Sequence, residues 1–221
     1  MAQYSRPVRI TLLADGTSDL VLRGPLDWLL QEYFPCEYLF QFADQIPSGP
    51  ALGTRICAAV ADYPCDILLV HRDAERKFAR TRLAEIEAAI KSATEAALEL
   101  IAVKCVRIVP VRMTEAWFLF DEAAIRRAAN RPHASDTLFL PTVSAARLMP
   151  DPKEVLRQLL ESASGLSGRK LERFTRDHPS HYHRICNLVT DFAPLMEVPE
   201  FVAFKDELVA AMTAFKNPAH G

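Results

Sequence analysis

The segment "DILLVH", from Asp66 to His71, is the feature that most constrains the fold. It is a continuous run of apolar residues, which is typical of a strand covered by helices on both faces. Similar short runs lie at Val8–Leu13, Tyr38–Phe42 and Val103–Val111. Helical patterns separate these runs, so the sequence predicts an α/β fold with a mainly parallel, Rossmann-like sheet and right-handed crossovers.

Helices are predicted between the strands and throughout the second half of the chain. The predicted connecting helices are Thr17–Tyr33 with a break at Gly24-Pro25, Leu52–Tyr63, and Arg76 to about Leu100. After Met113 the pattern is helical only, and Asp151-Pro152 is typical of the first residues of a helix. We therefore expect an α/β core over residues 1–120 and a helical carboxyl-terminal lobe, residues 121–221, packed on that core.

Composition excludes several classes of protein. Half of the 221 residues are apolar and the net charge is −2, which is ordinary for a globular protein and leaves only local patches to attract nucleic acid. The five cysteines are scattered without a CxxC spacing, so we expect reduced thiols rather than disulfides or a zinc site. No apolar stretch is long enough to span a bilayer, and we expect a cytoplasmic protein with no membrane association.

Acidic residues follow three of the predicted strands. Asp15 follows the first strand with Asp19 one turn later, Asp73 and Glu75 follow the third, and Glu115 follows the fourth. The carboxyl ends of parallel strands meet at one edge of the sheet, where such folds bind ligands. Carboxylates gathered there repel one another, and a hard divalent cation such as Mg²⁺ or Mn²⁺ removes that penalty. The pattern predicts one or two metal ions, as suits displacement at a phosphate.

Each acid also has an ordinary structural explanation. Asp15 can cap the helix that follows it, and Glu115 can be a first-turn acid favoured by the helix dipole. Asp73 can pair with a neighbouring arginine. The metal hypothesis therefore depends on the acids meeting at one place, and not on any single residue.

Basic residues lie beside the third strand in "RDAERKFARTR". Arg72 and Lys77 are nearest to the acids, so we expect them to bind a phosphate group of the substrate. A solvated helix face is the alternative for the other cations of this segment.

The segments "LLADGTSDLVL" and "DILLVHRDAE" resemble the TOPRIM domain, the metal-binding module of topoisomerases, primases and overcoming-lysogenization-defect nucleases. That domain has a strand ending in Glu-Gly, a further acid four residues later in the nuclease branch, and a strand ending in Asp-x-Asp. The segments "VPVRMTEAWFLFD", "DPKEVLRQLL" and "GRKLERF" extend the resemblance to short TOPRIM-like proteins over nearly the whole chain. Asp15 stands where the family has Glu, and Glu75 where it has Asp, so each carboxylate is displaced by about one bond.

The resemblance implies hydrolysis of DNA or RNA phosphodiesters by a metal-activated water. It implies that Asp15 and Asp73 are catalytic, that Asp73 and Glu75 hold Mg²⁺ or Mn²⁺, and that Asp19 and Glu115 complete a second ion site. Lys170 would contact the phosphate, with Lys153 as a rival. The resemblance also implies a prokaryotic anti-phage system with an ATPase partner. The alternative is a catalytically degenerate TOPRIM module that serves as an interaction or regulatory subunit.

Overall fold

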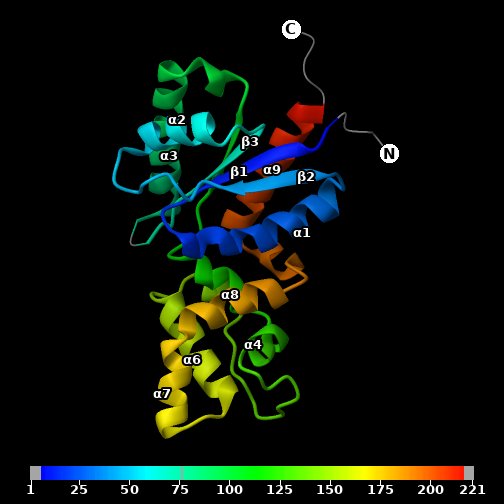
Figure 1. Cartoon of the computed structure of the whole chain (residues 1–221). Coiled ribbons are helices and arrows are strands. Elements are labelled where there is room, and N and C mark those ends of the chain that lie inside the picture. Colours follow the sequence, from blue (N-terminus) through cyan, green and yellow to red (C-terminus); the bar gives the residue numbers. More distant parts are fainter. Residues whose placement is uncertain (1–5, 76, 217–221) are drawn as a thin grey trace.

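The computed structural model describes residues 6–75 and 77–216 and has an α/β fold (Figure 1). In the described part of the chain, four parallel strands form one sheet in the order β2-β1-β3-β4. The strands are β1 (Val8–Leu13), β2 (Tyr38–Phe42), β3 (Ile67–His71) and β4 (Lys104–Ile108). The fold class is confirmed, and β1 and β2 have the predicted bounds. β4 is shorter than the predicted strand at both ends.

Helices cover both faces of the sheet, which explains why every residue of β3 is buried. The helices on one face are α1 (Arg23–Tyr33) and α9 (Pro199–Lys216), whose apolar side chains share a core with Val8, Ile10 and Leu12. The helices on the other face are α2 (Leu52–Asp62) and α3 (Ala79–Ala96), which pack on Leu13, Leu68 and Val70. Short η2 (Leu98–Ile101) follows α3. Arg76, the predicted start of α3, lies outside the described residues.

The strand order places a switch point between β1 and β3. α1 connects β1 to β2 over one face, and α2 connects β2 to β3 over the other face. The two connections therefore diverge from the carboxyl ends of β1 and β3, which leaves a crevice typical of ligand sites in open parallel sheets. The predicted first helix is divided into η1 (Thr17–Leu22) and α1, and Pro25 lies in the first turn of α1, where its missing N–H is tolerated.

A helical lobe follows β4. Its elements are η3 (Thr114–Phe118), α4 (Glu122–Ala128), α5 (Val143–Ala146), α6 (Pro152–Ser164), α7 (Gly168–Arg176) and α8 (His178–Leu188). As predicted, Asp151 caps α6 by accepting from the Glu154 amide at 2.9 Å. Phe118 of η3 is fully buried and contacts the ring of Tyr182 edge to face, so the lobe and the sheet share one apolar core.

The last helix does not stay with the lobe. After η4 (Ala193–Glu197), α9 runs back beside the sheet and packs on β4, whereas α4, α6, α7 and α8 gather below the sheet (Figure 1). Trp117 fixes this return, because its ring lies 5.2 Å from that of Phe201 and stacks on Phe204. Residues 121–216 thus form a lobe plus one helix of the sheet layer. Within the described residues, no helix has the length and apolar character that crossing a membrane requires.

Candidate functional site

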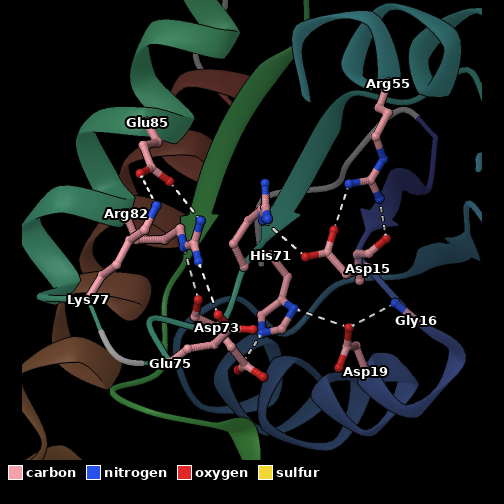
Figure 2. A network of polar contacts seen from close by, with 12 residues as sticks. Asp15, Gly16, Asp19, Arg55, His71, Asp73, Glu75, Lys77, Arg82 and Glu85 are labelled. Carbon is pink, nitrogen blue, oxygen red and sulfur yellow. Dashed lines mark hydrogen bonds and ion pairs between the residues drawn. The ribbon is translucent and has the colours of Figure 1, made fainter. Parts of the chain in front are cut away.

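The candidate site lies at the switch point, beyond the carboxyl ends of β1 and β3 (Figure 2). β1 leads directly to Asp15 and Gly16, and η1 begins one residue later. The Gly16 amide donates to Asp19 Oδ2 at 3.2 Å, which closes the turn between strand and helix. This bond holds the Asp19 carboxylate inward, and Asp19 is only 9% exposed.

His71, the last residue of β3, joins the acids of two different segments. Its Nδ1 lies 3.4 Å from Asp19 Oδ2, and its Nε2 lies 3.4 Å from Asp73 Oδ1 (Figure 2). The Thr114 hydroxyl donates to Asp73 Oδ1 at 3.1 Å and lies 3.2 Å from His71 Nε2. Burial disfavours the charged imidazole, but contacts with Asp19 and Asp73 outweigh it and raise the pKa of His71 to about 9. His71 is therefore positively charged at neutral pH.

Glu115 belongs to the same electrostatic group. It lies in η3 and is buried, although it carries a carboxylate. Burial raises the pKa of Glu115, the negative charges of Asp73 and Asp19 add to this rise, and Lys153 opposes it. Asp19, Asp73 and Glu115 therefore lie in one another's field, and in the described part of the chain none of their carboxylates pairs with a guanidinium.

Asp15 has different surroundings. Arg55 donates from Nη1 to Asp15 Oδ1 at 2.6 Å and from Nη2 to the Ala14 carbonyl at 2.6 Å (Figure 2). Arg72 Nε lies 3.0 Å from the other carboxylate oxygen of Asp15. The Arg55 side chain is only 2% exposed, whereas the Asp15 side chain is 42% exposed, so only the arginine of this pair is shielded from water. Both oxygens of Asp15 thus face cations of the protein itself.

Glu75 also turns away from the other acids. Its backbone has a φ of 53°, a left-handed conformation that a non-glycine residue rarely adopts. The backbone is held there by Arg112, whose carbonyl accepts from the Glu75 amide at 2.8 Å. The Glu75 side chain is 68% exposed, and one oxygen lies 3.7 Å from Arg82. The predicted Asp-x-Asp-like pair therefore splits, with Asp73 inside and Glu75 outside.

The predicted phosphate-binding cations lie in three places. Arg72 is at the site but pairs with Asp15, and Lys77 pairs with Glu85 of α3 at 2.6 Å. Lys170 is exposed on α7, in the helical lobe. Lys153, its rival, acts electrostatically on Glu115 and lies at the first turn of α6.

The structure thus brings together three of the five predicted metal ligands, Asp19, Asp73 and Glu115. Sequence reasoning missed Arg55 as the partner of Asp15, since a lone arginine on an apolar helix carries no signal of the direction it faces. His71, at the end of β3, lies within 3.2 Å of the Thr114 hydroxyl and within 3.4 Å of the carboxylates of Asp19 and Asp73.

Whether the site can hold a metal ion depends on how its donor side chains are arranged. Among residues 6–75 and 77–216, no three His, Cys, Asp or Glu side chains are arranged to hold a metal ion as they lie. Asp19, Asp73 and Glu115 offer the hard oxygen donors that Mg²⁺ and Mn²⁺ prefer, but His71 lies between the two aspartates. Asp15 and Glu75 fit less well, because guanidinium groups face them.

Comparison with family models, with curated proteins and with solved structures found no match to this chain, so the resemblance to TOPRIM proteins stays a prediction.

Proposed function

We propose that the chain hydrolyses phosphodiesters with the help of Mg²⁺ or Mn²⁺, for which Asp19, Asp73 and Glu115 would supply oxygen donors once the His71 ring no longer separates the two aspartates. One observation carries the proposal: these three carboxylates gather at the switch point, buried or partly buried, without a guanidinium partner among the described residues. The three carboxylates outnumber the His71 imidazole and the Lys153 ammonium that act on them, so carboxylate charge is in excess there. A divalent cation balances that charge, and its remaining positions suit a phosphate.

The residues around the acids have positioning roles in this proposal. His71 and Thr114 orient Asp73, and His71 with the Gly16 amide orients Asp19. Arg72 is the cation of the site nearest to these acids along the chain, and we assign it to the incoming phosphate. The ion, when bound, would activate a water molecule and neutralise charge on the phosphate. The proposed substrate is DNA or RNA, and the resemblance adds an ATPase partner in a prokaryotic defence system.

A second candidate is the non-catalytic module that binds a partner protein. The ion pairs of Asp15 with Arg55 and Arg72 favour it, because they satisfy the acid that TOPRIM enzymes use in catalysis. In that case the protein binds a partner and does not cleave nucleic acid, even where the site takes up a divalent ion.

Calorimetric titration with MnCl₂ tests the metal site, and cleavage of nucleic acid in the presence of Mn²⁺ separates the two candidates. We expect saturable binding to the wild-type protein at up to millimolar Mn²⁺, at least tenfold weaker binding to Asp73→Asn, and unchanged binding to Asp206→Asn. Asp206 is a suitable control because its side chain is 63% exposed on α9 and, among the residues that the structure describes, pairs with Lys205 alone. Circular dichroism checks that the variants fold. A wild-type protein that takes up no Mn²⁺ removes the metal-dependent proposal and leaves the module.

A further inference from the structure

α7 is a surface helix at the outer end of the helical lobe, away from the sheet (Figure 1). None of its nine residues is buried. Its inner face consists of Leu171, Phe174 and Thr175, which are half-buried. Phe174 stacks on His181 of α8 with ring centroids 4.0 Å apart, and the Thr175 hydroxyl donates to Glu161 of α6 at 3.0 Å. These contacts fix which side of α7 faces the solvent.

The outer face carries Arg169, Arg173 and Arg176, which we call the arginine stripe. A helix turns by about 100° per residue, so these three side chains lie within a sector of about 60°, opposite the inner face. All three are exposed, and Lys170 flanks them. With Glu172 as its single acid, α7 has a net charge of 4 − 1 = +3, whereas the whole chain has −2. The positive charge is therefore concentrated on this helix.

The charges of α7 do not serve the stability of the helix. Arg169 and Arg173 are four residues apart, where like charges repel. Arg169 and Lys170 lie in the first turn, which has no acid, and there the helix dipole disfavours cations. Only Arg173 and Arg176, in the last turn, are favourably placed with respect to the dipole. No side-chain partner at the protein surface offsets the repulsion, since none of the four cations forms an ion pair within the described residues.

Other arginines of the lobe have bonding partners within the protein. Arg157 of α6 lies between Glu154 and Glu161 and pairs with both. Arg147 forms two bonds of 2.7 Å to Glu200. Arginines that tie the lobe together thus have acceptors within the protein, either carboxylates or, for Arg127 and Arg184, carbonyl oxygens. Those of the arginine stripe have no such partner among the described residues. Unpaired, aligned cations are typical of a surface that meets an external polyanion.

We propose that the arginine stripe binds the phosphate backbone of a nucleic acid. From Arg169 to Arg176 the helix rises by about 10.5 Å, the length that about three consecutive phosphates of one strand occupy along a duplex. The inference rests on the proposed function, because a nuclease must hold the strand that it cuts. It adds the place where the backbone is held, away from the acids. Lys170, predicted to contact phosphate, would do so here rather than at the metal.

Binding is measured by fluorescence anisotropy with a labelled 20-base-pair DNA duplex and, separately, a labelled single-stranded RNA, in EDTA and at several salt concentrations. The variant Arg169→Gln/Arg173→Gln is compared with Lys91→Gln/Lys104→Gln, which removes two exposed cations from α3 and β4. For the duplex, each phosphate contact contributes about 0.9 to the slope of log affinity against log salt concentration. We expect the stripe variant to reduce that slope by about 1.8, to weaken binding at 0.1 M salt by at least about tenfold, and to retain its helical content. The control variant keeps the wild-type slope.

Three results overturn the inference: no binding of either probe by the wild-type protein, an unchanged slope in the stripe variant, or an equal loss in the control variant. The first result would leave an acidic protein as the partner that suits the stripe. Because EDTA prevents metal-dependent cleavage, the outcome is independent of the metal titration. A chain that binds DNA through α7 but takes up no Mn²⁺ keeps this inference and loses the proposed nuclease.

Discussion

Asp66 precedes β3 and Asp73 follows it, and the two carboxylates have opposite surroundings. Arg6 donates to Asp66 through two nitrogens at 2.6 and 2.7 Å, and the amide of Arg9 donates at 2.9 Å. Asp73 has only His71 and Thr114 as side-chain partners among the described residues. Burial opposes ionisation of Asp66, but its bonds to Arg6 and Arg9 prevail and lower the pKa of Asp66 to about 2. The fold therefore neutralises an acid at one end of the strand and leaves acids in excess at the other.

This difference separates acids that stabilise the structure from acids that are available to a ligand. Carboxylates that outnumber the cations beside them destabilise a protein, so such groups are typical of functional sites. Asp15 lies at the carboxyl edge but has the surroundings of Asp66, with two arginines. On this comparison Asp15 belongs to the structural class with Asp66, and we propose that Asp19, Asp73 and Glu115 form the functional class.

The largest expected effect is on activity. Asp73→Asn should reduce Mn²⁺-dependent cleavage of a nucleic-acid substrate by about 100-fold or more, since losing a residue that only orients a ligand already costs about 10–100-fold. Asp15→Asn should reduce cleavage by clearly less, because the Asp15 carboxylate forms ion pairs with Arg55 and Arg72. The test compares the initial cleavage rates of both variants with that of the wild-type protein at saturating Mn²⁺. Equal losses would place Asp15 among the catalytic acids, as the resemblance implies, and break the comparison.

The next effect concerns stability and its pH dependence. The folded-state pKa of Asp66 lies below its ordinary value. The ionised carboxylate therefore adds to the free energy of unfolding above about pH 4, and this contribution is lost as the pH falls through about 2. Arg6 and Arg9 are partly exposed, which reduces the contribution to about 1–2 kcal/mol. Urea unfolding at pH 5 should therefore show Asp66→Asn destabilised by that amount.

Lowering the pH provides the internal control for Asp66. The stability difference between wild type and Asp66→Asn should shrink toward zero between pH 4 and pH 2, because the wild-type carboxyl becomes protonated. All other acids titrate in both proteins and cancel. A difference that stays constant with pH would show that shape, and not charge, makes Asp66 stabilising.

Much of the fold was predictable from local patterns. Short apolar runs ended by Asp15-Gly16 or by Arg72-Asp73 mark the strands, because a parallel strand buried on both faces needs apolar residues throughout. The return of α9 to the sheet was not predictable. Its sequence shows that it has apolar residues to bury, and the partner surface is set by Trp117, which lies more than eighty positions earlier.

The site was predictable only to the level of the sheet edge. Parallel topology requires that residues after β1 and β3 come close, which places Asp15, Asp19 and Asp73 correctly. It does not determine what each carboxylate faces. That depends on Arg55, which is 40 positions away from Asp15 on α2, and on the left-handed backbone of Glu75. Neither feature has a sequence pattern, so the division of the acids into two classes required coordinates.

The smallest effect, at Glu115, tests the functional class most directly. Glu115→Gln keeps the shape of the side chain and removes one of three carboxylates that repel one another, of which Asp19 and Glu115 are buried and Asp73 is half-buried. In EDTA at pH 7 the variant should be more stable than wild type by a few tenths to about 1 kcal/mol, the opposite sign to Asp66→Asn. In millimolar Mn²⁺ the order should reverse, because only the wild-type site gains the full stabilisation from a bound ion. Thermal unfolding of both proteins in EDTA and in Mn²⁺ measures the sign of the stability difference in each buffer. A variant that is less stable than wild type in EDTA would make Glu115 a structural acid like Asp66, and the distinction between the two ends of β3 would fail.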